Sequence, residues 1–283
     1  MRVAPIAVAL ASFTLAGAAH AQDEGGAPEP PRRLTLQPLR ERPENETAEA
    51  PRKHAEERPF VYTLDPSTPT RGDVTLEYAA GMASGVAADR PLPSSVTSDG
   101  ITHAATVGYG ATDRIAPFVT VRVLQPGDQG AAHAGGAAGL RWQLTKPGAP
   151  FRLTLMAAGA RETEGTMTTY GRIAASYDYQ RLRIAANVHG EHAFARGRDG
   201  IDVLVFGGVS YRALDMFRFG AEYVGQDLEE AFDRDQAEGG AKHYAGPTFA
   251  FDGDTFQLVA GPAFGLTQAS SRMMGRAALV VAF

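Results

Sequence analysis

The sequence predicts an all-β protein: a transmembrane antiparallel up-and-down β-barrel of about twelve strands, with a disordered N-terminal tail. Three observations predict this fold. Segments of about ten residues recur in which apolar and polar side chains alternate. The connections between these segments differ in length in a regular order, as they do in membrane barrels. The charged residues within the segments lie on the face opposite the apolar one.

The first 21 residues have the pattern of a secretory signal peptide. Arg2 supplies the positive start, the stretch from Val3 to Leu15 is largely apolar, and Ala19 to Ala21 form a small-residue cleavage site. The apolar run is too short for the roughly 20 residues that a membrane-spanning helix needs. We therefore expect residues 1–21 to be removed and the remainder of the chain to be exported.

Residues 22–70 differ in composition from the rest of the chain, because proline, glutamate and arginine dominate and apolar residues are sparse. Such a segment buries too little apolar surface to offset the entropy lost on ordering. It predicts a disordered periplasmic tail that precedes a barrel at residues 71–283. A spacer is the simpler interpretation of the tail, and a tether to a periplasmic partner or to peptidoglycan is the alternative.

The chain contains no cysteine, which excludes disulfides, thiolate metal sites and a cysteine nucleophile. No stretch after the signal peptide approaches the length of a transmembrane helix. An exported chain of this kind is either soluble or crosses a membrane as a β-barrel. The alternative fold is therefore a soluble β-sandwich or lipocalin-like barrel, which would place its apolar side chains inside.

The alternation is most regular in the last predicted strand. There Leu279, Val281 and Phe283 share one apolar face, while Arg272 and Arg276 lie on the other. The same division recurs throughout residues 71–283, and an even number of strands is what a closed barrel of this class needs. The predicted strands are 73–82, 101–110, 115–124, 136–145, 151–160, 170–179, 181–191, 201–211, 216–226, 242–251, 255–266 and 272–283.

The predicted connections place the two ends of the chain. Membrane barrels of this class have short periplasmic turns and longer outer loops. Counted along the chain, every second connection is short, so all the short connections lie at one end of the barrel. That end is the periplasmic one, and both termini are expected there. The longer connections are 83–100, 125–135, 161–169, 192–200, 227–241 and 267–271.

The charged side chains of the inner face form the candidate functional site. Arg or Lys facing lipid at the membrane midplane costs about 2–4 kcal/mol, so the alternation assigns these residues to the lumen. The predicted lumen-lining basic residues are Arg122, Arg141, Arg152, Arg172, Arg181, Arg183, Arg218, Lys242, Arg272 and Arg276. The predicted lumen acids are Glu77, Asp178, Glu191, Asp202 and Glu222. Basic residues outnumber acids there, and basic rings in a pore favour anions.

This lining predicts a passive channel or uptake pore that prefers small anionic solutes. Pairing of the arginines with the lumen acids would instead fill the interior, and leave a closed structural or surface-binding barrel that acts through loops 83–100 and 227–241. Barrels of about eight strands have filled interiors and those of sixteen or more leave a channel, so the strand number does not decide between these functions.

A lipid-hydrolysing enzyme is the third possibility. His103 and His243 are the polar exceptions on the predicted lipid face, and Ser94, Ser95 and Ser270 lie in nearby loops. No Ser–His–acid spacing is visible, although such a triad is assembled in space rather than in sequence. We expect no enzymatic activity and no cofactor.

The stretch from His189 to His192 is the one cluster that could bind a metal. His189 and Glu191 are expected in the lumen and His192 at its rim, but no third ligand is evident, so no metal site is predicted. No phosphate-binding loop or nucleic-acid motif is present.

The C-terminal residues resemble the ending of Gram-negative outer-membrane β-barrel proteins, the porin and transporter-like superfamily. In that superfamily the last strand ends in an aromatic residue preceded by alternating apolar residues, and the barrel assembly machinery reads this ending. The matching residues are Ala277, Leu279, Val281 and Phe283. The resemblance implies a Gram-negative outer-membrane location, with membrane lipid, lipopolysaccharide and the assembly machinery as partners. The acidic loop 227–241 could bind divalent cations that bridge lipopolysaccharide, but its spacing matches no calcium loop and a solvated loop is the simpler interpretation.

Overall fold

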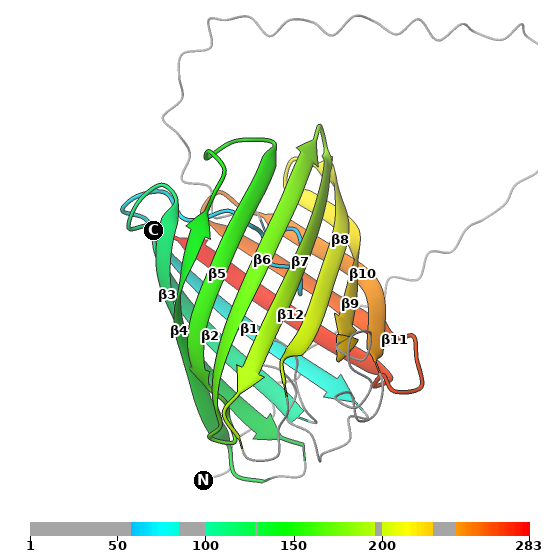
Figure 1. Ribbon diagram of the computed structural model, residues 1–283. Helices are drawn as coiled ribbons and strands as arrows, with labels where there is room; N and C mark the ends of the chain where they lie inside the picture. The colour runs from blue at the N-terminus through cyan, green and yellow to red at the C-terminus, as the bar shows by residue number, and fades with distance from the viewer. Residues whose placement is uncertain (1–57, 85–99, 128–129, 196–199, 229–240) are drawn as a thin grey trace, which may run out of the picture. The chain divides into compact units, whose positions relative to one another are not determined.

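The computed structural model describes residues 58–84, 100–127, 130–195, 200–228 and 241–283, which form a closed antiparallel barrel (Figure 1). Each strand is hydrogen-bonded to its neighbours in sequence, and the first strand pairs with the last. The predicted fold is confirmed, and each predicted segment overlaps one strand. The strands are β1 (Val74–Ser84), β2 (Gly100–Tyr109), β3 (Ile115–Pro126), β4 (His133–Gln143), β5 (Phe151–Arg161), β6 (Met167–Tyr179), β7 (Leu182–Ala193), β8 (Asp202–Leu214), β9 (Phe217–Gln226), β10 (Lys242–Asp252), β11 (Phe256–Gly265) and β12 (Met273–Ala282).

Several predicted features lie outside the described residues. They include the signal peptide at 1–21, the tail from 22 to 57, and most of loops 83–100 and 227–241. Among the residues that are described, no helix is long and apolar enough to cross a membrane.

The two ends of the barrel differ in the length of their connections. Five short turns join strands at the end where β1 begins and β12 stops, which we call the short-turn end. The opposite end, the long-loop end, carries the remaining connections. Gln180 adopts a left-handed backbone with φ of 54° in one of the two shortest turns. The short turns are 110–114, 144–150, 180–181, 215–216 and 253–255.

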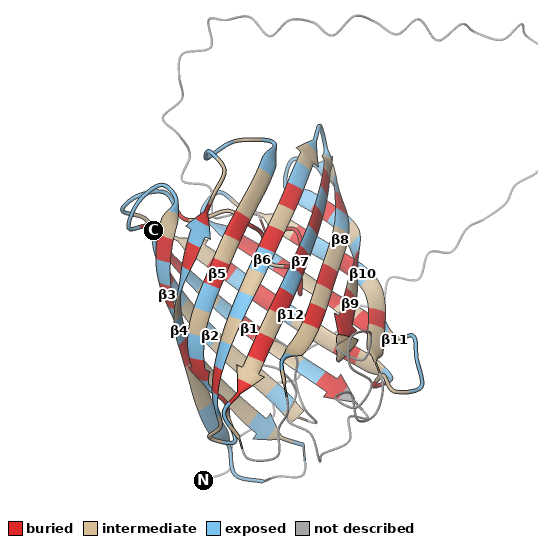
Figure 2. Cartoon of the chain, viewed as in Figure 1, coloured by how far each residue is buried: buried red, intermediate tan, exposed pale blue. Residues whose placement is uncertain are grey.

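The outer face of the barrel is apolar, and exposed and buried residues alternate along the strands (Figure 2). On β7, Ile184 and Val188 are about half exposed, whereas Asn187 and His189 on the opposite face are buried. Alternation of this kind separates a lipid face from a lumen face. Exposed aromatic residues gather toward the short-turn end, as in the aromatic girdles of membrane barrels. They include Tyr109, Trp142, Phe151, Tyr177, Tyr179, Tyr211, Phe217, Phe219, Phe256 and Phe283.

A charge introduced on the lipid face should destabilise the barrel according to its depth. Val188 lies at the middle of β7, so Val188→Arg is expected to lower the free energy of unfolding by about 2–4 kcal/mol. Leu214 lies at the short-turn end of β8, so Leu214→Arg should lower the free energy of unfolding by only about 0–1 kcal/mol. Urea unfolding of the two refolded variants in lipid vesicles measures the difference. Equal losses at the two positions would contradict the assignment of this face to lipid.

The C-terminal residues close the barrel against β1. Leu279 pairs with Tyr78 and Val281 with Leu76. The N–H of Phe283 donates to the carbonyl of Val74 at 3.0 Å, and the N–H of Val74 donates back at 3.4 Å. The last residue thus contributes to the seam of the barrel, and its recognition by the assembly machinery remains a prediction.

Candidate functional site: the barrel lumen and its N-terminal segment

The lumen is occupied by residues that precede β1. Residues 58–68, here called the N-terminal segment, lie against the inner wall, where Phe60 and Asp65 are only 3% and 2% exposed. In Figure 1 the blue trace that leads into β1 lies at the end of the barrel where the chain terminates. The prediction that a disordered tail extends to residue 70 does not hold for these residues, because wall side chains satisfy their backbone polar groups.

Glu222 of β9 binds three consecutive backbone groups of the N-terminal segment. Its carboxylate oxygens accept hydrogen bonds from the N–H groups of Val61, Tyr62 and Thr63 at 2.6, 2.9 and 2.8 Å. Glu222 is only 4% exposed. Buried backbone donors need partners, and this carboxylate supplies three of them from a strand far away in sequence.

Asn187 of β7 makes a reciprocal pair with the next residue of the segment. The N–H of Leu64 donates to Asn187 Oδ1 at 2.6 Å, and Asn187 Nδ2 donates to the carbonyl of Leu64 at 3.0 Å. The side-chain amide therefore binds the segment as a neighbouring strand would. Further bonds to the segment's main chain come from Gln143, Thr154, Thr248 and Gln257.

Apolar contacts also seat the segment. A Cβ atom at Gly208 would lie 2.5 Å from the Phe60 ring, so the ring rests directly on the backbone of β8. Val61 and Tyr62 join a buried cluster with Leu204, Phe206, Val224, Tyr244 and Met274 of the inner wall. Burial raises the pKa of the Tyr62 hydroxyl. The sequence interpretation, which assigned charged residues to the lumen, missed this apolar part of the inner face.

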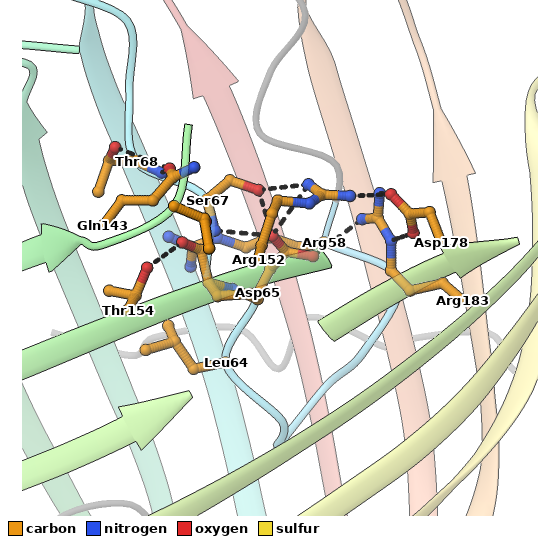
Figure 3. Close-up of polar contacts among 12 residues, drawn as sticks. Arg58, Leu64, Asp65, Ser67, Thr68, Gln143, Arg152, Thr154, Asp178 and Arg183 are labelled. Carbon is orange, nitrogen blue, oxygen red and sulfur yellow. Dashed lines mark hydrogen bonds and ion pairs between the residues drawn. The ribbon is translucent and has the colours of Figure 1, made fainter. Parts of the chain in front are cut away.

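The segment also enters an ion-pair network (Figure 3). Arg183 Nη1 lies 2.8 Å from Asp65 Oδ2, while Arg183 Nε and Nη2 lie 2.5 and 2.9 Å from the carboxylate of Asp178. Arg152 bonds to Asp178 as well, and its Nη1 lies 2.7 Å from Ser67 Oγ and 3.7 Å from Asp65 Oδ1. Two guanidinium groups thus face two carboxylates, one from the wall and one from the segment.

The other predicted basic residues on the inner face are mostly paired with carboxylates. The pairs are Arg122–Glu162 at 3.0 Å, Arg218–Asp252 at 3.1 Å, Lys242–Asp227 at 2.5 Å and Arg276–Glu77 at 3.2 Å. Arg141 and Arg172 lie over the rings of Phe118 and Phe206, with guanidinium carbons 5.3 and 4.9 Å from the ring centroids. Glu162, Asp227 and Asp252 lie at or beyond strand ends, and the sequence interpretation did not include them in the lumen.

Two of the predicted lumen-lining residues do not lie there. Arg181 is exposed in the turn between β6 and β7, where its Nη1 donates to the carbonyl of Ala213 at 3.1 Å. Arg272 is exposed in the connection before β12. Both assignments are wrong for the same reason: the strands begin one residue later, at Leu182 and Met273.

Glu162 lies just beyond β5 at the long-loop end. Burial raises the pKa of its carboxyl group to about 7, although Arg122 acts in the opposite direction. The folded chain therefore holds this proton more tightly than the unfolded chain. This group favours folding at acidic pH, and its contribution is lost as the pH rises through about 7.

The histidine cluster lies at the long-loop end of the lumen. His189 and Glu191 are buried on the inner face, with Nε2 and Oε2 3.3 Å apart. His192 Nδ1 lies 2.7 Å from the carbonyl of Gly200 at the rim. Asp202 is half-buried and pairs in register with Glu191. Within the described part of the chain, no three metal-ligating side chains gather into a possible site.

The two lipid-face histidines each bind a tyrosine rather than a serine. Tyr78 Oη lies 2.7 Å from His103 Nδ1, and Tyr223 Oη lies 2.6 Å from His243 Nδ1. Ser270 Oγ bonds to the backbone of His243, at 2.9 Å from its carbonyl oxygen. The serines at positions 94 and 95 lie outside the described residues. The described residues thus show no bond between a serine hydroxyl and a histidine ring.

Comparison with known proteins relates this barrel to porins. No protein-family model matches the chain, and no protein of curated function matches its sequence. The KdgM porin superposes with a TM-score of 0.52 at 8% identity, over 74% of this chain and 99% of that one. The NanC porin superposes with a TM-score of 0.53 at 10% identity, over 73% and 98%. The chain therefore shares the closed antiparallel barrel fold of these two porins.

Proposed function

We propose that this chain is a passive outer-membrane channel, that it prefers small anionic solutes, and that its own N-terminal segment closes the lumen in the conformation described. The observation that carries the proposal is the charged lining of the inner wall. Ionic side chains occur at the long-loop end, as in Arg122–Glu162, and at the short-turn end, as in Arg218–Asp252. Ionisable side chains within the membrane are rare, and they mark pathways for solutes and ions.

The preference for anions is inferred from the arginines between the two ends. Arg141 and Arg172 are held over aromatic rings and Arg276 is paired with Glu77. Basic side chains in a pore lower the barrier for anions and raise it for cations. Neutralising Arg141 should therefore reduce the preference.

A closed structural or surface-binding barrel is the second candidate, and one observation favours it. Leu204, Phe206 and Val224 on the inner wall have no exposed surface, so the lumen around them is filled. A water-filled pore would leave such wall residues accessible. In a channel, displacing the N-terminal segment opens a path for solutes through the lumen. In a closed barrel, the same displacement opens no such path.

Conductance in planar bilayers distinguishes these two functions. The refolded mature chain should conduct little, and Gly208→Leu should raise conductance, because its side chain overlaps the space of the buried Phe60 ring and displaces it. Gly207→Leu is the matched control, since that residue points to the lipid face and a Cβ there meets no atom closer than 3.9 Å. In a salt gradient the open variant should show an anion-selective reversal potential, which Arg141→Gln reduces.

One outcome would overturn the channel, and another would overturn its selectivity. A folded Gly208→Leu barrel that stays silent although its segment has become sensitive to protease would favour the closed scaffold. A cation-selective conductance would contradict the preference for anions. The periplasmic position of the termini, the absence of enzymatic activity and the roles of lipopolysaccharide and the assembly machinery remain predictions.

A further inference from the structure

We infer that Arg152 and Arg183 form a carboxylate-binding site in the lumen, which Asp65 fills while the N-terminal segment is seated and a small carboxylate anion takes when it is not. The inference rests on the proposed function in one respect: a solute reaches the site through the open lumen.

Arg183 is held rigidly by the wall and directs one nitrogen at the segment. Two of its nitrogens, Nε and Nη2, bind Asp178 of the adjacent strand in a side-on pair. The third, Nη1, points at Asp65 Oδ2 from 2.8 Å. Arg183 is 3% exposed. A guanidinium fixed in this way presents a preorganised donor, and arginine is the residue best suited to planar carboxylates.

Arg152 supplies the other side of the site. Its Nη1 reaches Ser67 Oγ and the second carboxylate oxygen of Asp65. Its Nε is buried and has no hydrogen-bond partner among the described residues. The N–H of Ser67 also donates to Asp65 Oδ1, at 2.9 Å. Ser67 belongs to the segment and leaves with it, so the wall would offer a ligand the donors of two arginines.

The charge balance of the site favours an anion. While Asp65 is in place, two guanidinium groups face two carboxylates. When the segment leaves, the site keeps Asp178 but loses the second carboxylate, so the two guanidinium groups leave an excess positive charge on the wall that favours an anion. A carboxylate restores the balance with two oxygens placed as those of Asp65 are. A chloride ion restores the charge but cannot bridge both arginines with separate oxygen atoms.

Chemical rescue of an Asp65→Ala variant of the full mature chain tests the site. The substitution should lower the midpoint of thermal unfolding of the refolded barrel in detergent micelles. Potassium acetate should restore part of the loss, while potassium chloride at the same concentration should not. Asp254→Ala is the matched control, because Asp254 is exposed in the turn between β10 and β11. That variant should show no acetate-specific shift.

A double variant, Asp65→Ala with Arg152→Gln, should lose the acetate effect. Equal rescue by chloride, or rescue that persists in the double variant, would overturn the carboxylate site. If Asp65→Ala does not fold, Asp65→Asn keeps the shape of the side chain and permits the same titration. Because unfolding is measured rather than conductance, a barrel that shows rescue yet stays silent would refute the channel and leave the carboxylate site intact.

Discussion

Arg183→Ala is expected to lower the free energy of unfolding of the barrel by about 3–5 kcal/mol. The substitution leaves Asp65, which is 2% exposed, without its closest cation, and removes the side-on partner of Asp178. Breaking a buried ion pair by removing one partner is costly because the remaining charge stays buried. Urea unfolding in lipid vesicles measures the loss.

Arg181→Ala is the control for this prediction. The residue has the same type and lies two positions away, but it is exposed in a turn, where its side chain bonds to the backbone carbonyl of Ala213 near the end of β8. The change should therefore alter the free energy of unfolding by about 0.5 kcal/mol or less. Similar losses in the two variants would show that Arg183 is not paired in the lumen.

Glu222→Ala should release the N-terminal segment from the lumen. The substitution removes the acceptor of three buried N–H groups, and each unsatisfied group costs about 1–3 kcal/mol. The segment is joined to the wall by non-covalent contacts, so it should leave the lumen rather than remain with these groups unpaired. Chymotrypsin is then expected to cleave after Phe60 and Tyr62, which are buried in the unaltered chain.

Glu222→Gln is the matched variant, since it keeps one oxygen acceptor of the same shape and should be cleaved more slowly. Fragment masses identify the sites, and cold gel mobility reports whether the barrel itself stays folded. Resistance of Glu222→Ala to cleavage after Phe60 and Tyr62 would mean that this carboxylate does not hold the segment.

The strands were predictable because lipid imposes a rule that each strand obeys locally. A residue pair such as Ile184 and Val188 must face outward together, which fixes the phase of β7 from its own sequence. Strand ends were less predictable. Arg181 continues the alternation of polar and apolar residues in β7, although the chain at this position is still in the turn before the strand. This one-residue error sufficed to place Arg181 and Arg272 in the lumen wrongly.

The N-terminal segment was not predictable from composition. Averaged over residues 22–70, proline and charge dominate, and the short, largely apolar stretch from Phe60 to Leu64 is lost in that average. This run was the available signal. Its partners were not accessible to sequence reasoning, since Glu222 follows Tyr62 by 160 residues. Glu222 was identified as a lumen acid, but its role as an acceptor for backbone N–H groups depends on the closed barrel.

Hydrogen exchange of the N-terminal segment tests the central claim most directly. In the refolded full mature chain, the amides of Val61, Tyr62, Thr63 and Leu64 should exchange as slowly as strand amides, because each is bonded to a buried wall side chain. Mass spectrometry of the peptides that span residues 58–68 gives the rates. Slow exchange there is the result expected of a segment seated in the lumen. Exchange as fast as in an unstructured peptide, in a barrel whose strands remain protected, would contradict it.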